Sequence, residues 1–137
     1  MEKTLKTNYL VNEIEGVSQG KLVILLYDGA IKFLKFSLKY LEEKDIEKCH
    51  NNIMKTENII YGLMLNVDQK AGKLSDNLLK VYEFLLWQLK EANILKDKEK
   101  ILSVITLLDS LRNAWRIAVL KNSNANVDEK KSINMSI

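Results

Sequence analysis

The stretch LYDGAIKFL, residues 26–34, decides how this chain folds, because it can be interpreted in two ways. An Asp-Gly pair between apolar runs is a strong β-hairpin signal. A hairpin needs alternating apolar and polar residues on both sides, and the run LVILLY (residues 22–27) does not alternate. Apolar residues recur instead at the helical intervals of three and four: Val23, Tyr27, Ala30, Ile31, Leu34, Leu38 and Leu41. The stretch therefore predicts a helix with Gly29 in its interior, at a cost of about 1 kcal/mol relative to alanine.

The composition extends this prediction to the whole chain. It has 137 residues, no proline and only five glycines, whereas a β-sandwich or barrel would need more turn residues. Abundant Leu, Ile, Lys and Glu favour helices. The length is that of a single domain with one core, and a single cysteine excludes an intramolecular disulfide.

Four helical segments follow from the apolar spacing, and short links join them. They cover Ser18–Lys44, Asp45–Val67, Leu74–Asn93 and Asp97–Leu120. Asp45 and Asp97 are suitable N-caps, and Gly72 is a helix breaker. The pattern predicts an all-α protein, an antiparallel four-helix bundle.

The two ends of the chain differ from the predicted bundle in composition. We expect a short N-terminal arm over residues 1–17, a bundle domain over 18–120 and a disordered tail over 121–137, which is polar and non-periodic.

The residue inventory argues against catalysis and against a metal. Di-iron bundles use two Glu-x-x-His motifs, and His50 is the single histidine here. Cys49 beside it does not complete a zinc site, and adjacent helical residues point about 100° apart, which prevents a Cys-His dyad. No glycine-rich phosphate loop is present. We expect no enzyme activity, no metal and no cofactor.

The charge pattern limits the partners. The net charge is +3, but the lysines are spread along the chain, so we expect no nucleic-acid partner. No run of 18 apolar residues predicts a membrane span, and the first residues lack the apolar core of a signal peptide. We therefore expect a cytoplasmic protein.

Apolar residues are more numerous than one core requires. A bundle helix needs an apolar stripe roughly 100° wide. In VYEFLLWQL (residues 81–89), seven of nine residues are apolar, and Val81, Phe84 and Trp87 lie off the face that contains Leu85 and Leu89. Two faces on one helix predict a second packing partner, which can be a neighbouring layer, a dimer mate or a bound helix. A broad core face is the alternative.

Four motifs, in this order, resemble the flagellar secretion chaperone family, FliS: LYDGAIKFL (26–34), NNIMKTENIIYGL (51–63), DNLLKVYEFLLWQLKEAN (76–93) and LLDSLRNAW (107–115). The resemblance runs from about Tyr9 to Ala118. In the first motif we expect Gly29 to let another helix backbone come close. The family usually starts its first long helix with Ser-Pro, whereas this chain has SQGK (18–21), so we expect that helix end to fray.

The resemblance implies an antiparallel helical bundle that binds the disordered C-terminal segment of flagellin. It implies that the chaperone prevents premature polymerisation in the cytoplasm and delivers flagellin to the flagellar export apparatus. The bound segment would gain helix on apolar surface that the chaperone's own N-terminal segment can cover. An adaptor or co-chaperone for another secreted client is the alternative, and a homodimer stays open.

This interpretation places the binding surface mainly on the second and third helices. The candidate partner contacts are Ile53, Ile60, Leu63, Met64, Leu79, Val81, Tyr82, Leu86 and Trp87. Tyr9 and Leu10 are the candidates for the self-covering arm. Each contact could instead belong to the core, and this alternative is strongest for Ile53, Ile60 and Tyr82.

Overall fold

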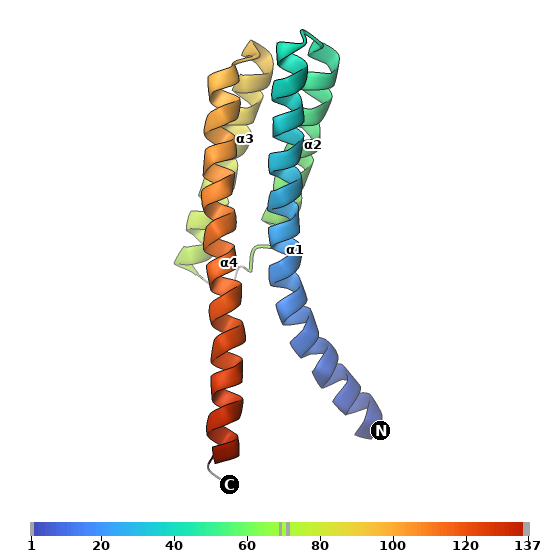
Figure 1. Ribbon diagram of the computed structural model, residues 1–137, viewed down its shortest axis with the longest axis vertical. Helices are drawn as coiled ribbons and strands as arrows, with labels where there is room; N and C mark the ends of the chain where they lie inside the picture. The colour runs from blue at the N-terminus through green and yellow to red at the C-terminus, as the bar shows by residue number, and fades with distance from the viewer. Residues whose placement is uncertain (1, 69, 71, 136–137) are drawn as a thin grey trace. The chain divides into compact units, whose positions relative to one another are not determined.

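The described part of the chain forms four α-helices. The computed structural model describes the backbone of residues 2–68, 70 and 72–135 and the side chains of residues 19–68, 70 and 72–121. The helices are α1 (Glu2–Glu42), α2 (Ile46–Leu65), α3 (Lys73–Leu95) and α4 (Lys98–Met135) (Figure 1). No strand occurs among the described residues. The predicted all-α fold is confirmed.

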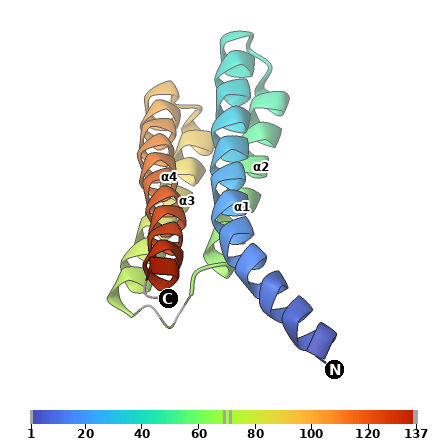
Figure 2. The ribbon, with the colours of Figure 1, turned by 60° about the horizontal axis from the view of Figure 1, so that its bottom comes forward.

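Residues 26–111 form one compact unit, to which all four helices contribute. Within it, short connections at alternate ends make successive helices run in opposite directions (Figure 2). Side-chain contacts join each neighbouring pair: Thr56 with the carbonyl of Ala30, His50 with Asn93, Glu91 with Lys100, and Glu42 with Lys98. The antiparallel four-helix bundle predicted from the sequence is confirmed. Residues 1–25 and 112–137 form a second compact unit.

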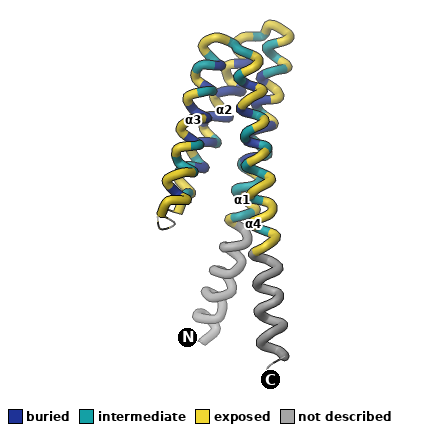
Figure 3. Tube along the Cα trace, turned by 90° about the vertical axis from the view of Figure 1, so that its left-hand side faces the viewer, coloured by how far each residue is buried: buried dark blue, intermediate teal, exposed yellow. Residues whose placement is uncertain are grey.

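The bundle core is made from the predicted apolar stripes. Buried positions recur along each of the four helices in the 26–111 unit (Figure 3). The buried apolar residues are Tyr27, Ala30, Ile31, Leu34, Cys49, Ile53, Ile60, Leu63, Tyr82, Leu85, Leu86, Leu89, Ala92, Ile101, Val104 and Leu108. Their intervals of three and four residues keep them on one side of each helix.

Two buried tyrosines connect α1 and α3 through this core. The hydroxyl oxygens of Tyr27 and Tyr82 lie 2.5 Å apart. A buried hydroxyl needs a hydrogen-bonding partner, so the pair lets two large rings fill the core without an isolated polar atom.

The helix ends confirm the local signals in the sequence. The Asp45 carboxylate accepts a hydrogen bond from the backbone N–H of Lys48 at 3.1 Å, and that of Asp97 accepts one from Glu99 at 3.0 Å. These carboxylates satisfy backbone donors that have no partner within the first turn of a helix. Gly72 has a φ of +65° directly before α3, a conformation that glycine adopts without strain.

The outer boundaries of α1 and α4 differ from the prediction. The backbone of α1 is helical from Glu2 rather than Ser18, and that of α4 continues to Met135 rather than ending at Leu120. Neither segment contains a proline, which would break a helix in its interior. The division into an arm, a bundle domain and a tail stays a prediction.

The SQGK stretch (18–21) lies inside α1, so the expectation of a fraying helix start there is wrong. A Cβ atom on Gly20 would lie only 2.6 Å from Cγ2 of Val119 on α4. The absence of a side chain therefore allows α1 and α4 to come close at this point.

Candidate partner-binding faces

Five of the nine predicted partner contacts are core residues in this structure. Ile53, Ile60, Leu63, Tyr82 and Leu86 are at most 7% exposed. The reason is that they share the helical spacing of the core stripe, which their sequence pattern alone does not distinguish from a binding face. In this conformation they offer almost no surface to a partner, and their part in binding stays a prediction.

The other four predicted contacts reach the surface. Met64, Leu79 and Val81 are half-buried, and Trp87 is 55% exposed on the outer side of α3. A tryptophan with half of its surface in water is unusual in a bundle that has a complete core, so Trp87 is the strongest of the predicted contacts. The side chains of Tyr9 and Leu10 lie outside the described residues.

Exposed apolar side chains form two rows on α2 and α3. The rows consist of Met54, Tyr61 and Leu65 on α2, and Trp87 and Ile94 on α3. Steps of four and seven residues keep each row on one side of its helix. Met54 and Tyr61 follow His50 by one and three turns, and His50 hydrogen-bonds Asn93 of α3 at 2.8 Å. This contact aligns the two helices, and we call the five residues the α2–α3 face.

A pocket of about 110 Å³ lies between α3 and α4. Its lining consists of Phe84, Leu85, Gln88, Ser103, Val104 and Leu107. This volume is far below the few hundred Å³ that small-molecule sites occupy, so the pocket suits one apolar side chain rather than a cofactor. None of its six residues was a predicted contact. Among these six residues, Phe84 is the one that the sequence pattern places outside the core face of α3, and it is half-exposed in the structure.

One acidic residue is buried beside the α2–α3 face. Glu57 is 5% exposed, and burial raises the pKa of its carboxyl above the ordinary value of 4.5, while Lys90 and His50 oppose the rise. Desolvation disfavours the charged carboxylate, so its effect exceeds the attraction of the two basic groups.

The cysteine of the bundle, Cys49, lies in its core. Burial raises the pKa of the Cys49 thiol, and Lys96 opposes the rise only in part. A buried neutral thiol is a poor nucleophile. Among the described residues, no group of three or more His, Cys, Asp or Glu side chains could hold a metal ion.

These features define a class, the helical bundles whose surplus apolar surface suits the binding of other chains. A sequence profile of the family described as "Flagellar protein FliS" matches residues 1–123. The chain is 28% identical over 113 residues to the flagellar secretion chaperone FliS of Bacillus subtilis, covering 82% of this chain and 84% of the relative. It is 31% identical over 105 residues to that of Salmonella typhimurium, covering 75% and 78%. This chain belongs to the FliS family of flagellar secretion chaperones.

Family membership implies a chaperone rather than an enzyme, with partners in flagellar export. The resemblance stated from the four sequence motifs is thereby confirmed. Within the described part of the chain, no helix has the length and apolar character needed to span a bilayer.

Proposed function

We propose that this chain is a cytoplasmic chaperone that binds the C-terminal segment of flagellin, prevents its polymerisation before export and delivers it to the flagellar export apparatus. The family supports the role, because the curated relatives that this chain matches are flagellar secretion chaperones. The observation that carries the proposal is the exposed apolar row on α3, above all Trp87. A helix-in-groove complex uses such rows to bury the apolar side of its client.

The proposed client path crosses the outer side of α3. Trp87 belongs to the α2–α3 face and Phe84, one turn before it, borders the pocket toward α4. A flagellin segment that crosses α3 can therefore contact both residues and place one side chain in the pocket. The predicted contacts that are buried, such as Ile60, pack in the core beneath the helix surfaces that the client would contact. Tyr9 and Leu10 stay our candidates for covering it when no client is bound.

Coupled folding and binding supplies the energetics. Each Å² of apolar surface that the client covers contributes about 25 cal/mol. Ordering a disordered segment costs a few kcal/mol, so a stable complex requires an extended interface. An extended interface also hides the surface that flagellin uses for self-assembly, which explains how one binding event can prevent polymerisation.

A sedimentation assay of flagellin assembly tests the proposal. Monomeric flagellin of the same organism is seeded with filament fragments, with and without an equimolar amount of the full chain. We expect the chain to keep flagellin in the supernatant and Trp87→Ala to weaken this effect, whereas Lys35→Ala, at an exposed position on α1 outside the proposed client path, leaves it unchanged. Assembly at an unchanged rate with excess chain would contradict the flagellin role and favour an adaptor for another secreted client.

A further inference from the structure

Three lysine ammonium groups lie over three aromatic rings on the side of the bundle formed by α1 and α2. The Nζ atoms of Lys55 and Lys48, from α2, lie 5.4 Å from the ring centres of Phe33 and Tyr40 on α1. Within α1, the Nζ atom of Lys32 lies 5.7 Å from the ring centre of Phe36. We call these six residues the α1–α2 seam: Lys32, Phe33, Phe36, Tyr40, Lys48 and Lys55. All of them belong to the 26–111 unit.

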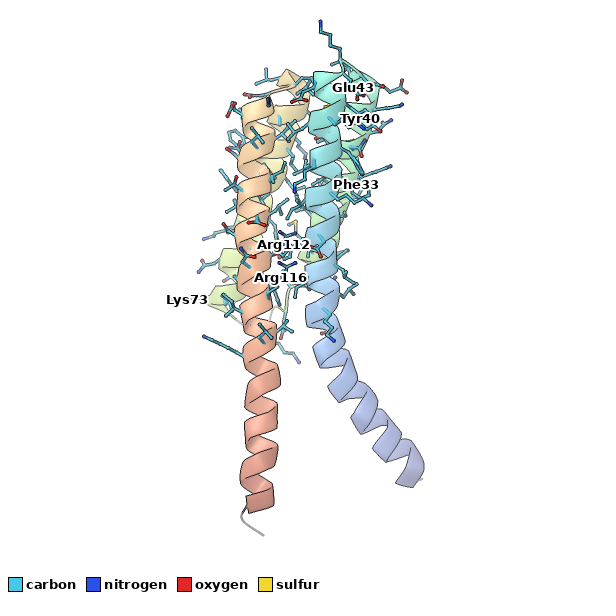
Figure 4. The ribbon with its side chains drawn as sticks, viewed as in Figure 1. Phe33, Tyr40, Glu43, Lys73, Arg112 and Arg116 are labelled. Carbon is cyan, nitrogen blue, oxygen red and sulfur yellow. The ribbon has the colours of Figure 1, made fainter. Side chains whose placement is uncertain are left out.

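The two contacts across the seam repeat with a regular spacing. Phe33 and Tyr40 are seven residues apart on α1, and Lys48 and Lys55 are seven residues apart on α2. Seven residues make two helical turns, or about 10 Å along the axis. Because α1 and α2 are antiparallel, the same pair of residue types recurs two turns further along the seam. Figure 4 shows Phe33, Tyr40 and Glu43 following one another along α1.

The charge of the seam is positive over most of its length. Lys32 and Lys55 form no ion pair with any described residue, and Lys48 contacts the partly exposed Asp45 at 3.8 Å. Glu43 and Asp45 lie at the end of the seam, around the α1–α2 connection. A cation over an exposed ring is held only weakly, so the ammonium groups are positioned there yet stay available to carboxylates.

The seam also offers apolar surface between its charges. Phe36 is 38% exposed and lies between Phe33 and Tyr40 along α1. Exposed aromatic side chains flanked by cations suit a partner that has an apolar stripe with carboxylates beside it. Carboxylates seven residues apart on a helix match the spacing of Lys48 and Lys55.

We propose that the α1–α2 seam is a second docking site, which binds an acidic amphipathic helix of a partner protein. Charge complementarity and the two-turn repeat select this occupant. Nucleic acid fits less well, because three lysines are too few for the dense basic patch that such binders carry. The site is separate from the α2–α3 face and does not depend on the proposed flagellin role, so the two can fail independently.

A designed peptide tests the proposal directly. The probe is a fluorescein-labelled helical peptide of about 18 residues, five turns, with glutamates seven residues apart on both sides of a leucine stripe. Its control has the same composition in scrambled order. Fluorescence anisotropy with the full chain at low salt should show saturable binding of the probe and no saturable binding of the scrambled peptide.

Two matched double variants locate the site. Lys48→Glu with Lys55→Glu should weaken binding of the probe by about tenfold or more. The two introduced glutamates would then repel the glutamates of the peptide. The new glutamate at position 48 lies in the first turn of α2, where acidic residues are favourable, so the helix start is preserved. Lys73→Glu with Lys80→Glu, both exposed on α3, should change binding by less than about twofold. Phe36→Ser tests the apolar contact at unchanged charge and should also weaken binding.

Several results would overturn this proposal. They are the absence of saturable binding, equal binding of the scrambled peptide, and an equal loss in the α3 control pair. Displacement of the probe by the C-terminal flagellin segment would show that the α1–α2 seam is part of the flagellin-binding surface rather than a second site. Tighter binding of a single-stranded RNA through the same lysines would assign the seam to nucleic acid instead.

Discussion

At the scale of single residues, two glycines in helix interiors differ in what a side chain would meet. A Cβ atom on Gly62 meets nothing within 4 Å, whereas one on Gly29 lies 3.4 Å from Cδ1 of Ile59 on α2. The expectation that Gly29 admits a neighbouring backbone is therefore wrong, because the neighbour is the end of a side chain. Close packing of α2 against α1 nevertheless limits the size of a substituent there.

This difference predicts distinct effects of substitution. Gly62→Ala should raise the free energy of unfolding by about 1 kcal/mol, the gain in helix propensity. Gly29→Ala should gain less, because Ile59 has to move, and Gly29→Leu should lower stability by about 1–3 kcal/mol through overpacking. Chemical denaturation of the three variants measures these values. Equal stabilisation by alanine at both positions, with no loss for leucine, would contradict the packing described here.

Glu57 predicts a pH dependence of stability. Its pKa is raised in the folded state, so the folded protein holds this proton more tightly than the unfolded chain. The resulting stabilisation is present below the ordinary value of 4.5 and is lost as the pH rises through the folded-state pKa. Glu57→Gln should therefore be more stable than the parent at pH 7, and this advantage should shrink toward pH 4.

Thermal melts between about pH 4 and pH 8 measure this effect across the relevant titration range. The matched control is Glu83→Gln, an exposed position on α3, which should change the melting temperature little at any pH. Lower stability of Glu57→Gln at neutral pH would show that the attraction of Lys90 and His50 outweighs desolvation.

At the scale of the helix, periodicity determined which residues face inward but not which outward residues bind a partner. The apolar spacing of α3 correctly placed Leu85 and Leu89 in the core. Both a core stripe and a binding stripe follow the period of 3.6, so Ile60 and Tyr82 could not be assigned before the bundle was known. The helix ends at Asp45, Asp97 and Gly72 were predictable, because capping and positive φ depend on local chemistry alone.

The α1–α2 seam could not be predicted from the sequence, because it depends on contacts between different helices. Lys55 and Phe33 are far apart in the chain and meet only because α1 and α2 pack antiparallel in one register. In the sequence the lysines look dispersed, and the bundle brings three of them to one side. The helical backbone after Leu120 was missed for another reason: this polar segment has no apolar stripe and therefore leaves no periodic signal.

Helices α2 and α3 predict a separation of stability from binding. Ile60→Ala should lower the free energy of unfolding by about 2–5 kcal/mol, because it leaves a cavity in the core. Trp87→Ala should change stability by no more than about 0.5 kcal/mol, since the side chain is largely exposed, yet weaken binding of the flagellin segment. Thermal melts together with binding assays check both variants. Strong destabilisation by Trp87→Ala without loss of binding would assign this residue to packing.

At the scale of the whole molecule, one compact unit carries several surfaces. The α2–α3 face, the α3–α4 pocket and the α1–α2 seam all belong to residues 26–111. They lie between different pairs of neighbouring helices, so a bundle can hold a client on one side while another side stays accessible. This arrangement suits a secretion chaperone, which has to hold a client and also meet further components of the export pathway.

The central claim is that flagellin folds onto the apolar side of this bundle. Calorimetric titration of the full chain with the C-terminal segment of flagellin from the same organism tests it most directly. We predict saturation at one segment per chain and a strongly negative change in heat capacity, the signature of apolar burial coupled to folding. The absence of heat and of any mobility shift, with circular dichroism confirming a folded bundle, would contradict the claim.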